Sequence, residues 1–312
     1  MVSAQATQIH AVVRGSWSFG VAVLAGLLAV FLAAGCGQGS PEQRGGETTE
    51  SPSGTIEEQT RQQTTSERLT GETPFTAAPE TSGGSQGAAD GILEVNFERH
   101  EGYERAVLGF GSGNVPASGV PAWSLSSPEG EGYARITFPD LVTTSVPDGI
   151  LGGSTLNSFY VVRAPGGGLF VDIFASGAFR YRVTELEDPA RLAIDYRPAS
   201  VDLGFPIPVR EARTVLFEPR VGEAVTSPLW VSGYSRNPEA SNTITLVDAG
   251  GNVLSRSTVL SNDWLDTWGY FEASLEFPPF EGQAILRAGG QSARDGSFEG
   301  VEAPVVYGRV LE

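Results

Sequence analysis

The sequence predicts an all-β protein of two β-sandwich domains, which follow a signal peptide and a disordered tether. Three observations lead to this fold class. A short apolar run ends at the only cysteine of the chain, Cys36, and a polar stretch of low complexity extends from there to residue 90. From Ile92 onward, apolar and polar residues alternate in many short runs, as they do in half-buried strands. No later segment has a sustained helical pattern, although residues 140–155 are compatible with one short helix.

The apolar run has the length of a secretory signal. Residues 21–32, VAVLAGLLAVFL, carry no charge and follow Arg14, and they are too few to span a bilayer as a helix. Three small residues, Ala33 to Gly35, then precede Cys36. This arrangement resembles the lipobox of bacterial lipoproteins. The resemblance implies that residues 1–35 are removed, and that the Cys36 sulfur carries a diacylglyceryl group that anchors the chain to the outer face of the cell membrane. The alternatives are a signal-anchor helix or an incidental cysteine.

Residues 36–90 are predicted to form the lipidated cysteine and its disordered tether. The segment is rich in Gly, Ser, Thr, Glu, Gln and Pro, and its large apolar residues are few, chiefly Ile56, Leu69 and Phe75. Such a segment cannot bury enough apolar surface to offset the loss of chain entropy on folding.

Composition excludes several classes of function. The net charge is −17 and all 20 basic residues are arginine, so the overall field would repel nucleic acid. Beyond Cys36 there is no other thiol, and His100 is the one histidine after the signal peptide, which excludes disulfides, thiol nucleophiles and zinc sites built on several imidazoles. The GFGSGN motif at 109–114 does not lie in a βαβ unit and is read as a turn. We therefore expect no metal, no cofactor and no enzymatic activity.

A first β domain is expected at residues 91–198. Runs such as ILEVNFE, YARITF, LFVDIFA, FRYRVT and RLAIDYR repeat with a period of two. In FRYRVT the alternation directs Phe179, Tyr181 and Val183 inward, and Arg180 and Arg182 outward. Residues 199–210, which contain two prolines and no clear alternation, are predicted to be a short linker.

A second β domain is expected at residues 211–312. The alternation is clearest in FEASLEF, where the residues from Phe271 to Phe277 are apolar at every second position. Leu229 with Val231, and Ile244 with Leu246, follow the same rule, and residues 249–252, AGGN, form a hairpin turn. About seven short strands over roughly 100 residues are typical of an immunoglobulin-like sandwich.

Both domains resemble known families. Residues 213–311, through FEPRVGEAVTSPLWVSGYS, LVDAGGNVL, DWLDTWGYFEASLEF and SARDGSFEGVEAPVVYG, resemble the Gmad-type immunoglobulin-like domain of bacterial sporulation and germination lipoproteins. Residues 92–198, through HEGYERAVLGF and FRYRVTELEDPARLAIDYRP, are similar to the AMIN-like domain of actinobacterial lipoproteins. The second resemblance implies a small sandwich that localises envelope proteins, in better understood relatives by contacting peptidoglycan. The first implies an adhesive or interaction role without known enzymatic activity.

Two groups of residues and one histidine are candidates for binding. Arg180 and Arg182 share a strand face and suit the carboxylates of wall peptides, because arginine binds carboxylates through two hydrogen bonds; the alternative is a solvated strand face. His100 is a weaker candidate, with a structural or capping role as the alternative. Trp264, Trp268 and Tyr270 lie beside two aspartates and suit sugar rings; the alternative is that these rings fill the core of the sandwich. The aspartates lack the spacing of a calcium loop.

Together these features predict a non-enzymatic, lipid-anchored protein of the cell envelope that binds peptidoglycan or another wall polymer, envelope proteins, or both. One alternative is an accessory subunit of a sporulation, germination or division complex that binds a protein partner. A remote alternative is a wall-modifying hydrolase.

Overall fold

The computed structural model describes residues 73–85, 87–128, 131–199, 207–292 and 294–308. The predicted signal peptide, Cys36 and most of the predicted tether lie outside these residues. The prediction of disorder is wrong for the described end of the tether, because Glu80–Gly83 form a paired strand and Thr76 bridges to Tyr181. The first sandwich therefore begins before the predicted boundary at residue 91. Residues Leu69–Glu312 belong to one compact unit. The described part is nearly all β, with a single short 3-10 turn at Pro238–Ala240, so the predicted fold class is confirmed. None of its helical segments is long and apolar enough to cross a membrane.

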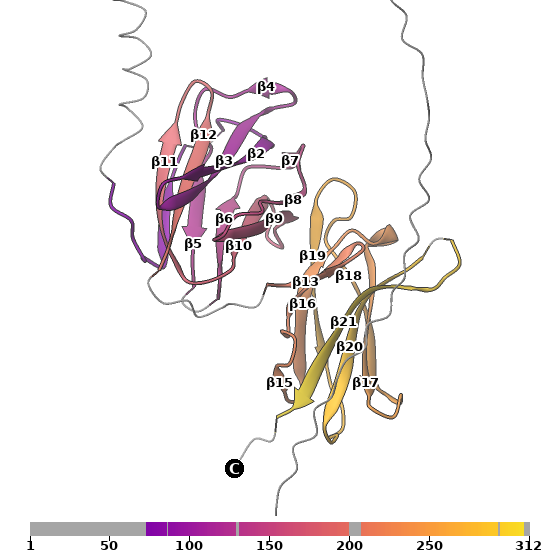
Figure 1. The fold of residues 1–312 in the computed structure, drawn as a ribbon. Helices are drawn as coiled ribbons and strands as arrows, with labels where there is room; N and C mark the ends of the chain where they lie inside the picture. The colour runs from indigo at the N-terminus through magenta and orange to yellow at the C-terminus, as the bar shows by residue number, and fades with distance from the viewer. Residues whose placement is uncertain (1–72, 86, 129–130, 200–206, 293, 309–312) are drawn as a thin grey trace, which may run out of the picture. The chain divides into compact units, whose positions relative to one another are not determined.

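The N-terminal sandwich consists of two facing sheets, drawn from indigo to rose in Figure 1. One sheet has the strand order β11 (Phe179–Leu186), β12 (Arg191–Pro198), β3 (Tyr103–Ser112), β2 (Gly91–His100) and β7 (Thr143–Thr144), with β4 (Val115–Pro116) beside β3. The other has the order β1 (Glu80–Gly83), β5 (Trp123–Ser126), β6 (Tyr133–Phe138), β10 (Leu169–Ala175) and β9 (Leu156–Arg163), with β8 (Asp148–Ile150) beside β9.

The short helix considered for residues 140–155 is wrong, because β7 and β8 occupy this segment. The alternation predicted for β11 is confirmed: Tyr181 is buried in the core between the two sheets, and Phe179 and Val183 pack against it. The facing strands contribute Ile136 and Ile173 to the same core. The faces of these strands are therefore fixed by the period of two in the sequence.

The C-terminal sandwich, orange to yellow in Figure 1, also has two layers. Its first layer has the order β19 (Trp268–Leu275), β16 (Leu229–Ser235), β14 (Thr214–Glu218) and β13 (Val209–Glu211). Its second layer has the order β15 (Ala224–Val225), β21 (Phe298–Tyr307), β20 (Gln283–Gln291), β17 (Ser241–Asp248) and β18 (Val253–Leu260). Strand β13 begins inside the segment predicted as a linker, of which residues 200–206 lie outside the described chain.

The predicted core of this sandwich is confirmed. The apolar residues singled out by the alternation are all buried in one cluster, which includes Val231, Ile244, Leu246 and Phe271. The predicted hairpin turn joins β17 to β18, and Gly251 adopts the left-handed φ of +84° there, a conformation that favours glycine.

The two sandwiches share a sheet. Strand β19 of the second pairs in parallel with β9 of the first, with Trp268 opposite Val162 and Gly269 opposite Arg163. One layer of each sandwich therefore belongs to a continuous ten-stranded sheet. This pairing brings together side chains that are about a hundred residues apart in sequence, and it positions the site described next.

Candidate functional site

A third hydrophobic cluster lies between the two sandwiches. It combines buried aromatic and aliphatic residues from both, and its rings contact one another in tilted or edge-to-face arrangements; for example, the ring centroids of Tyr160 and Trp268 are 5.4 Å apart at 85°. Such aromatic contacts add to the free energy of burial. The buried members are Tyr133, Tyr160, Val162, Phe170 and Phe174 from the first sandwich, and Val215, Tyr234 and Trp268 from the second.

A buried carboxylate lies within this cluster. Asp172 on β10 is 0% exposed and accepts two hydrogen bonds of 2.8 Å from its cross-strand neighbour Arg135. The hydroxyl of Tyr234, from the other sandwich, also donates to Asp172 and accepts a 3.1 Å hydrogen bond from Arg135. Burial and the nearby Asp172 carboxylate raise the pKa of Tyr234 well above its ordinary value. The phenol therefore remains a proton donor, and its hydroxyl connects both members of the ion pair to the second sandwich through two hydrogen bonds.

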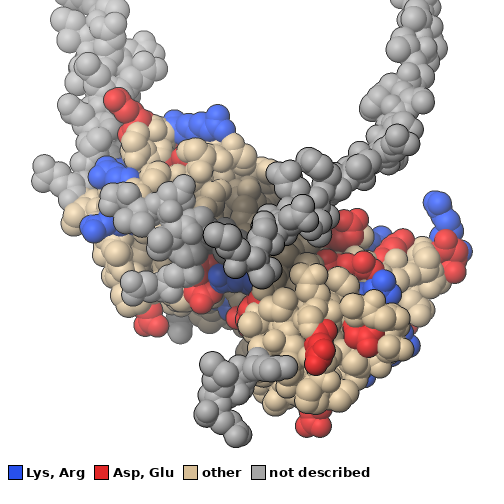
Figure 2. Space-filling view, turned by 60° about the horizontal axis from the view of Figure 1, so that its bottom comes forward, with Lys and Arg blue, Asp and Glu red and all other residues tan. Residues whose placement is uncertain are grey.

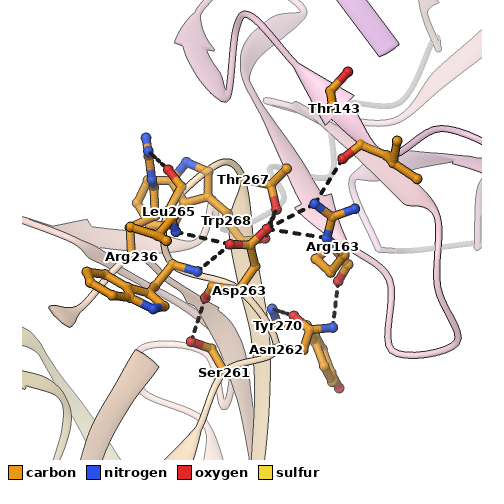
Figure 3. A network of polar contacts seen from close by, with 12 residues as sticks. Thr143, Arg163, Arg236, Ser261, Asn262, Asp263, Leu265, Thr267, Trp268 and Tyr270 are labelled. Atoms are coloured by element: carbon orange, nitrogen blue, oxygen red, sulfur yellow. Dashed lines mark hydrogen bonds and ion pairs between the residues drawn. The ribbon is translucent and has the colours of Figure 1, made fainter. Parts of the chain in front are cut away.

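A second polar network crosses the junction at Asp263, in the loop before β19 (Figure 3). The Asp263 carboxylate accepts hydrogen bonds from the backbone N–H groups of Trp264 and Leu265 and from the Thr267 hydroxyl. It also forms an ion pair of 3.1 Å with Arg163 at the end of β9. Burial alone would raise the pKa of Asp263, but these hydrogen bonds outweigh it and lower the pKa. Asp263 therefore shapes its own loop and connects it to the first sandwich.

Asp148 on β8 makes a third connection. Its carboxylate accepts a 2.8 Å hydrogen bond from the Trp268 indole and pairs with Arg210 on β13 at 3.2 Å. The Arg210 guanidinium also lies over the faces of the Trp268 and Tyr160 rings, at 5.1 and 5.6 Å from their centroids. Arg210 thus combines an ion pair with two cation–π contacts at the mouth of the junction.

The third connection, of Asp148 with Arg210 and Trp268, borders a cleft of about 400 Å³ at the junction, which we call the junction cleft. Asp148 is its lining residue from the first sandwich, and its other lining residues belong to the second. Two further arginines contribute to it: Arg213 in the β13–β14 turn and Arg236 directly after β16. The Arg236 guanidinium donates to the backbone carbonyl of Leu265 at 2.6 Å. The residues that line the junction cleft include Asp148, Arg210, Arg213, Arg236, Trp264 and Leu265.

The structure separates the three aromatic residues predicted for sugar binding. Trp268 is 1% exposed and both its indole N–H and its ring face are occupied by junction contacts. Tyr270 is half-buried next to Tyr234 and its hydroxyl donates to Glu272. Trp264 is half-buried and lines the junction cleft. Trp268 and Tyr270 both have ring contacts with other residues. Among the described residues, Trp264 makes no aromatic or cation–π contact, so its ring is the one of the three that remains free to contact a ligand in the cleft.

The two arginines predicted on β11 also have different environments. Arg182 and Arg105 both pair with Asp195, which is 1% exposed and lies between them in cross-strand register. The ring of Phe75 covers Arg182 at 4.7 Å. Because its guanidinium is already paired and covered, Arg182 is not available with Arg180 as a double clamp for a carboxylate.

Arg180 is exposed, and its neighbour across the strands is Arg197, also exposed. Arg197 lies at 4.0 Å from the centroid of Phe75. The predicted candidate His100 is exposed at the end of β2, where its ring stacks on Tyr103 at 4.6 Å and an interplanar angle of 6°. His100 and Tyr103 border a groove of about 610 Å³ at one end of the first sandwich, whereas neither Arg180 nor Arg197 lines it.

The floor of this end groove is already filled by a carboxylate. Glu104 accepts hydrogen bonds from the backbone N–H groups of Ser154, Thr155 and Leu156 and from the Ser154 hydroxyl, at 2.7 to 3.0 Å. Burial raises the pKa of Glu104, but the four hydrogen bonds outweigh it and the net effect lowers the pKa. The donors that would attract an external anion are therefore occupied by the protein itself.

On the face drawn in Figure 2, arginine side chains lie among carboxylates and do not merge into a continuous basic surface over the described residues. The described residues also contain no group of three or more His, Cys, Asp or Glu side chains placed to hold a metal ion. The clustering of three arginines around the junction cleft is therefore a local feature of an acidic chain.

Sequence reasoning missed the arginines of the junction cleft and the buried ion pair. The ion pair has a signal: Asp172 and Arg135 are charged residues inside the apolar runs LFVDIFA and YARITF. A charge in such a strand is stable only when paired. The sequence around Arg213 and Arg236 has no comparable feature. These arginines meet Trp264 and Asp148 at the junction cleft only in the folded protein, because these residues are far apart in the sequence.

The C-terminal sandwich matches a known family. Residues 214–297 match the family model Gmad2, described as an immunoglobulin-like domain of bacterial spore germination. This segment extends from β14 to the loop before β21 and includes Arg236 and Trp264. No curated protein and no solved structure matches the chain.

Proposed function

We propose that the chain is a lipid-anchored accessory protein of spore germination, which binds peptidoglycan or another wall polymer at the outer face of the cell membrane and does not catalyse a reaction. The observation that carries the proposal is the Gmad2 match of residues 214–297. The sandwich that contains these residues contributes most of the lining of the junction cleft. Clefts at domain junctions are common sites for small ligands, and polar groups that converge there provide specificity.

The lipid anchor rests on the sequence alone. The small residues before Cys36 resemble a lipobox, and two or more acyl chains hold a protein on a membrane stably. Mass spectrometry of the mature protein tests this part: the chain should begin at Cys36 and carry the mass of the lipid. The Cys36→Ala variant should be absent from the membrane fraction, whereas the control Ser40→Ala should remain there. Full-length Cys36→Ala protein that stays membrane-bound would contradict the anchor.

The AMIN-like resemblance of residues 92–198 supports a role for the first sandwich in wall contact. Retention on purified sacculi tests it: the detergent-solubilised full chain should be retained at low and moderate salt. A chain that passes through sacculi unretained would contradict wall binding.

A second candidate is an accessory subunit that binds an envelope protein. The two-layer C-terminal sandwich favours it by analogy of fold, because immunoglobulin-like folds often serve as interaction modules. Capture of one defined envelope protein by the full chain, together with no retention on sacculi, would favour this candidate over wall binding.

A further inference from the structure

The charge of the junction cleft opposes that of the chain. Three arginines and one carboxylate line it, giving a local charge of 3 − 1 = +2 in a chain of net charge −17. Arg210 is neutralised by Asp148. Among the described residues, no carboxylate lies within ion-pair distance of Arg213 or Arg236. The cleft therefore contains two guanidinium groups whose charge is not compensated locally.

These two guanidinium groups retain donors for a ligand. Each arginine has five N–H donors, and Arg236 uses its short contact with the Leu265 carbonyl, a neutral acceptor. The backbone N–H of Arg236 donates to the Arg213 carbonyl at 2.9 Å, so the two residues are neighbours on adjacent chain segments. An oxyanion bound between them would receive hydrogen bonds from charged donors on both sides.

Arg213 is carried by a two-residue hairpin turn between β13 and β14, and Ala212, the first residue of the turn, has φ of +49°. The favoured two-residue hairpin turns require a positive φ at this position. The turn places Arg213 directly before β14, where its carbonyl accepts a hydrogen bond from the backbone N–H of Arg236.

The cleft also has an apolar wall. Trp264 lines it, and Leu265, which is 61% exposed, follows directly. The loop that holds both is fixed by Asp263, whose carboxylate caps their backbone N–H groups and pairs with Arg163 of the other sandwich (Figure 3). An indole face beside arginine donors suits a sugar ring, whose apolar face packs on the indole while an acidic substituent reaches the guanidinium.

We propose that the junction cleft binds a sugar that carries an anionic substituent, with the ring on Trp264 and the anionic group between Arg213 and Arg236. This inference rests on the proposed wall-polymer binding and specifies its ligand. The shared chemistry has two sources in a bacterial wall: the carboxylate of muramic-acid sugars, and the phosphate of sugar- or polyol-phosphate polymers.

The test is an NMR titration of the full chain, which follows the tryptophan indole N–H signals. The probes are two matched pairs: N-acetylmuramic acid with N-acetylglucosamine, and glucose 6-phosphate with glucose. We expect the acidic member of at least one pair to bind about tenfold or more tightly than its neutral match, the effect of a charged hydrogen bond. The pair with the larger ratio identifies the source of the anion.

Variants assign the contacts. Arg213→Gln and Arg236→Gln should each remove most of the acidic preference, and Trp264→Ala should weaken acidic and neutral sugars alike. The matched controls are Arg287→Gln, an exposed arginine on β20 outside the cleft, and Trp230→Ala, a 63% exposed tryptophan outside the cleft. Neither control should change either ratio.

The outcomes separate this inference from the proposed function. Equal binding of acidic and neutral sugars, or an acidic preference that survives both arginine variants, overturns the inference. Binding to sacculi with no sugar binding in the cleft overturns the inference and leaves wall binding in place. Acidic sugar binding without retention on sacculi supports the cleft and contradicts the proposed polymer.

Discussion

The hydrogen bond from Tyr234 to Asp172 can be removed by deleting one oxygen atom, the hydroxyl oxygen of Tyr234. Tyr234→Phe deletes the hydroxyl and retains the ring, so the aromatic packing between the sandwiches persists. Arg135 still donates two hydrogen bonds to Asp172 after the change. The ion pair within the first sandwich is therefore left intact, and what is lost are the two hydrogen bonds that join it to the Tyr234 hydroxyl, the one to Asp172 and the one from Arg135.

The magnitude follows from the charge and burial of the acceptor. A hydrogen bond to a charged group contributes about 1.5–3 kcal/mol net, and this acceptor is 0% exposed. We therefore expect Tyr234→Phe to lower the free energy of unfolding by about 2 kcal/mol. The matched control is Tyr270→Phe, which removes an exposed hydroxyl that donates to Glu272 at 3.1 Å. Its effect should stay within about 0.5 kcal/mol.

Urea denaturation of the full chain, followed by tryptophan fluorescence, measures both variants. Tyr234→Phe should shift the midpoint to lower urea and separate the unfolding of the two sandwiches, because their coupling is weaker. A midpoint equal to that of Tyr270→Phe would refute the reasoning, since the buried hydroxyl would then contribute no more than an exposed one.

Two further changes test the loops that shape the sites. Because the pKa of Glu104 is lowered in the folded state, its ionised form contributes stability that is present above its unfolded pKa of about 4.5 and is lost as the pH falls through the folded pKa. Glu104→Gln should therefore lower the free energy of unfolding at pH 7 and flatten the loss of stability as the pH falls below about 4.5, as measured by urea midpoints. Gly269→Ala would place a Cβ 2.0 Å from the Asp263 carbonyl oxygen, so it should destabilise the chain by about 1–3 kcal/mol and displace the Asp263 loop. The control is Gly166→Ala, whose Cβ would have no atom within 4 Å and which should be neutral. Thermal melts of both variants measure the difference.

Local pattern was sufficient to predict the cores. The side-chain period of a strand places residues on a face without reference to any partner, so Tyr181 in one sandwich and Ile244 in the other lie where the alternation puts them. The same rule correctly placed Arg182 on the outer face of β11. It could not identify the partner of Arg182, because Asp195 is brought opposite by the register of β12, which depends on the whole sheet.

The candidate site could be predicted only in part. The aromatic residues near the start of β19 were recognised as a group, but one lies in the junction, one is half-buried and one lines the cleft. Two contacts between residues far apart in sequence determine the positions of these side chains. Asp148 accepts a hydrogen bond from Trp268, 120 residues away, and Arg163 binds Asp263 in the loop before β19, 100 residues away. The alternation of residues within a strand does not predict such contacts, because they form between two sandwiches whose sequence patterns are independent of each other.

The junction and the junction cleft share few residues. Asp148 is the lining residue from the first sandwich, whereas Arg213, Arg236 and Trp264, the expected sugar contacts, all belong to the second. A weaker junction therefore leaves the expected sugar contacts in place. Tyr234→Phe removes one of several connections, since the pairs of Asp148 with Arg210 and of Asp263 with Arg163 remain. It should consequently lower stability without changing sugar affinity more than about twofold. A parallel loss of both would mean that the Tyr234 hydrogen bond alone maintains the cleft.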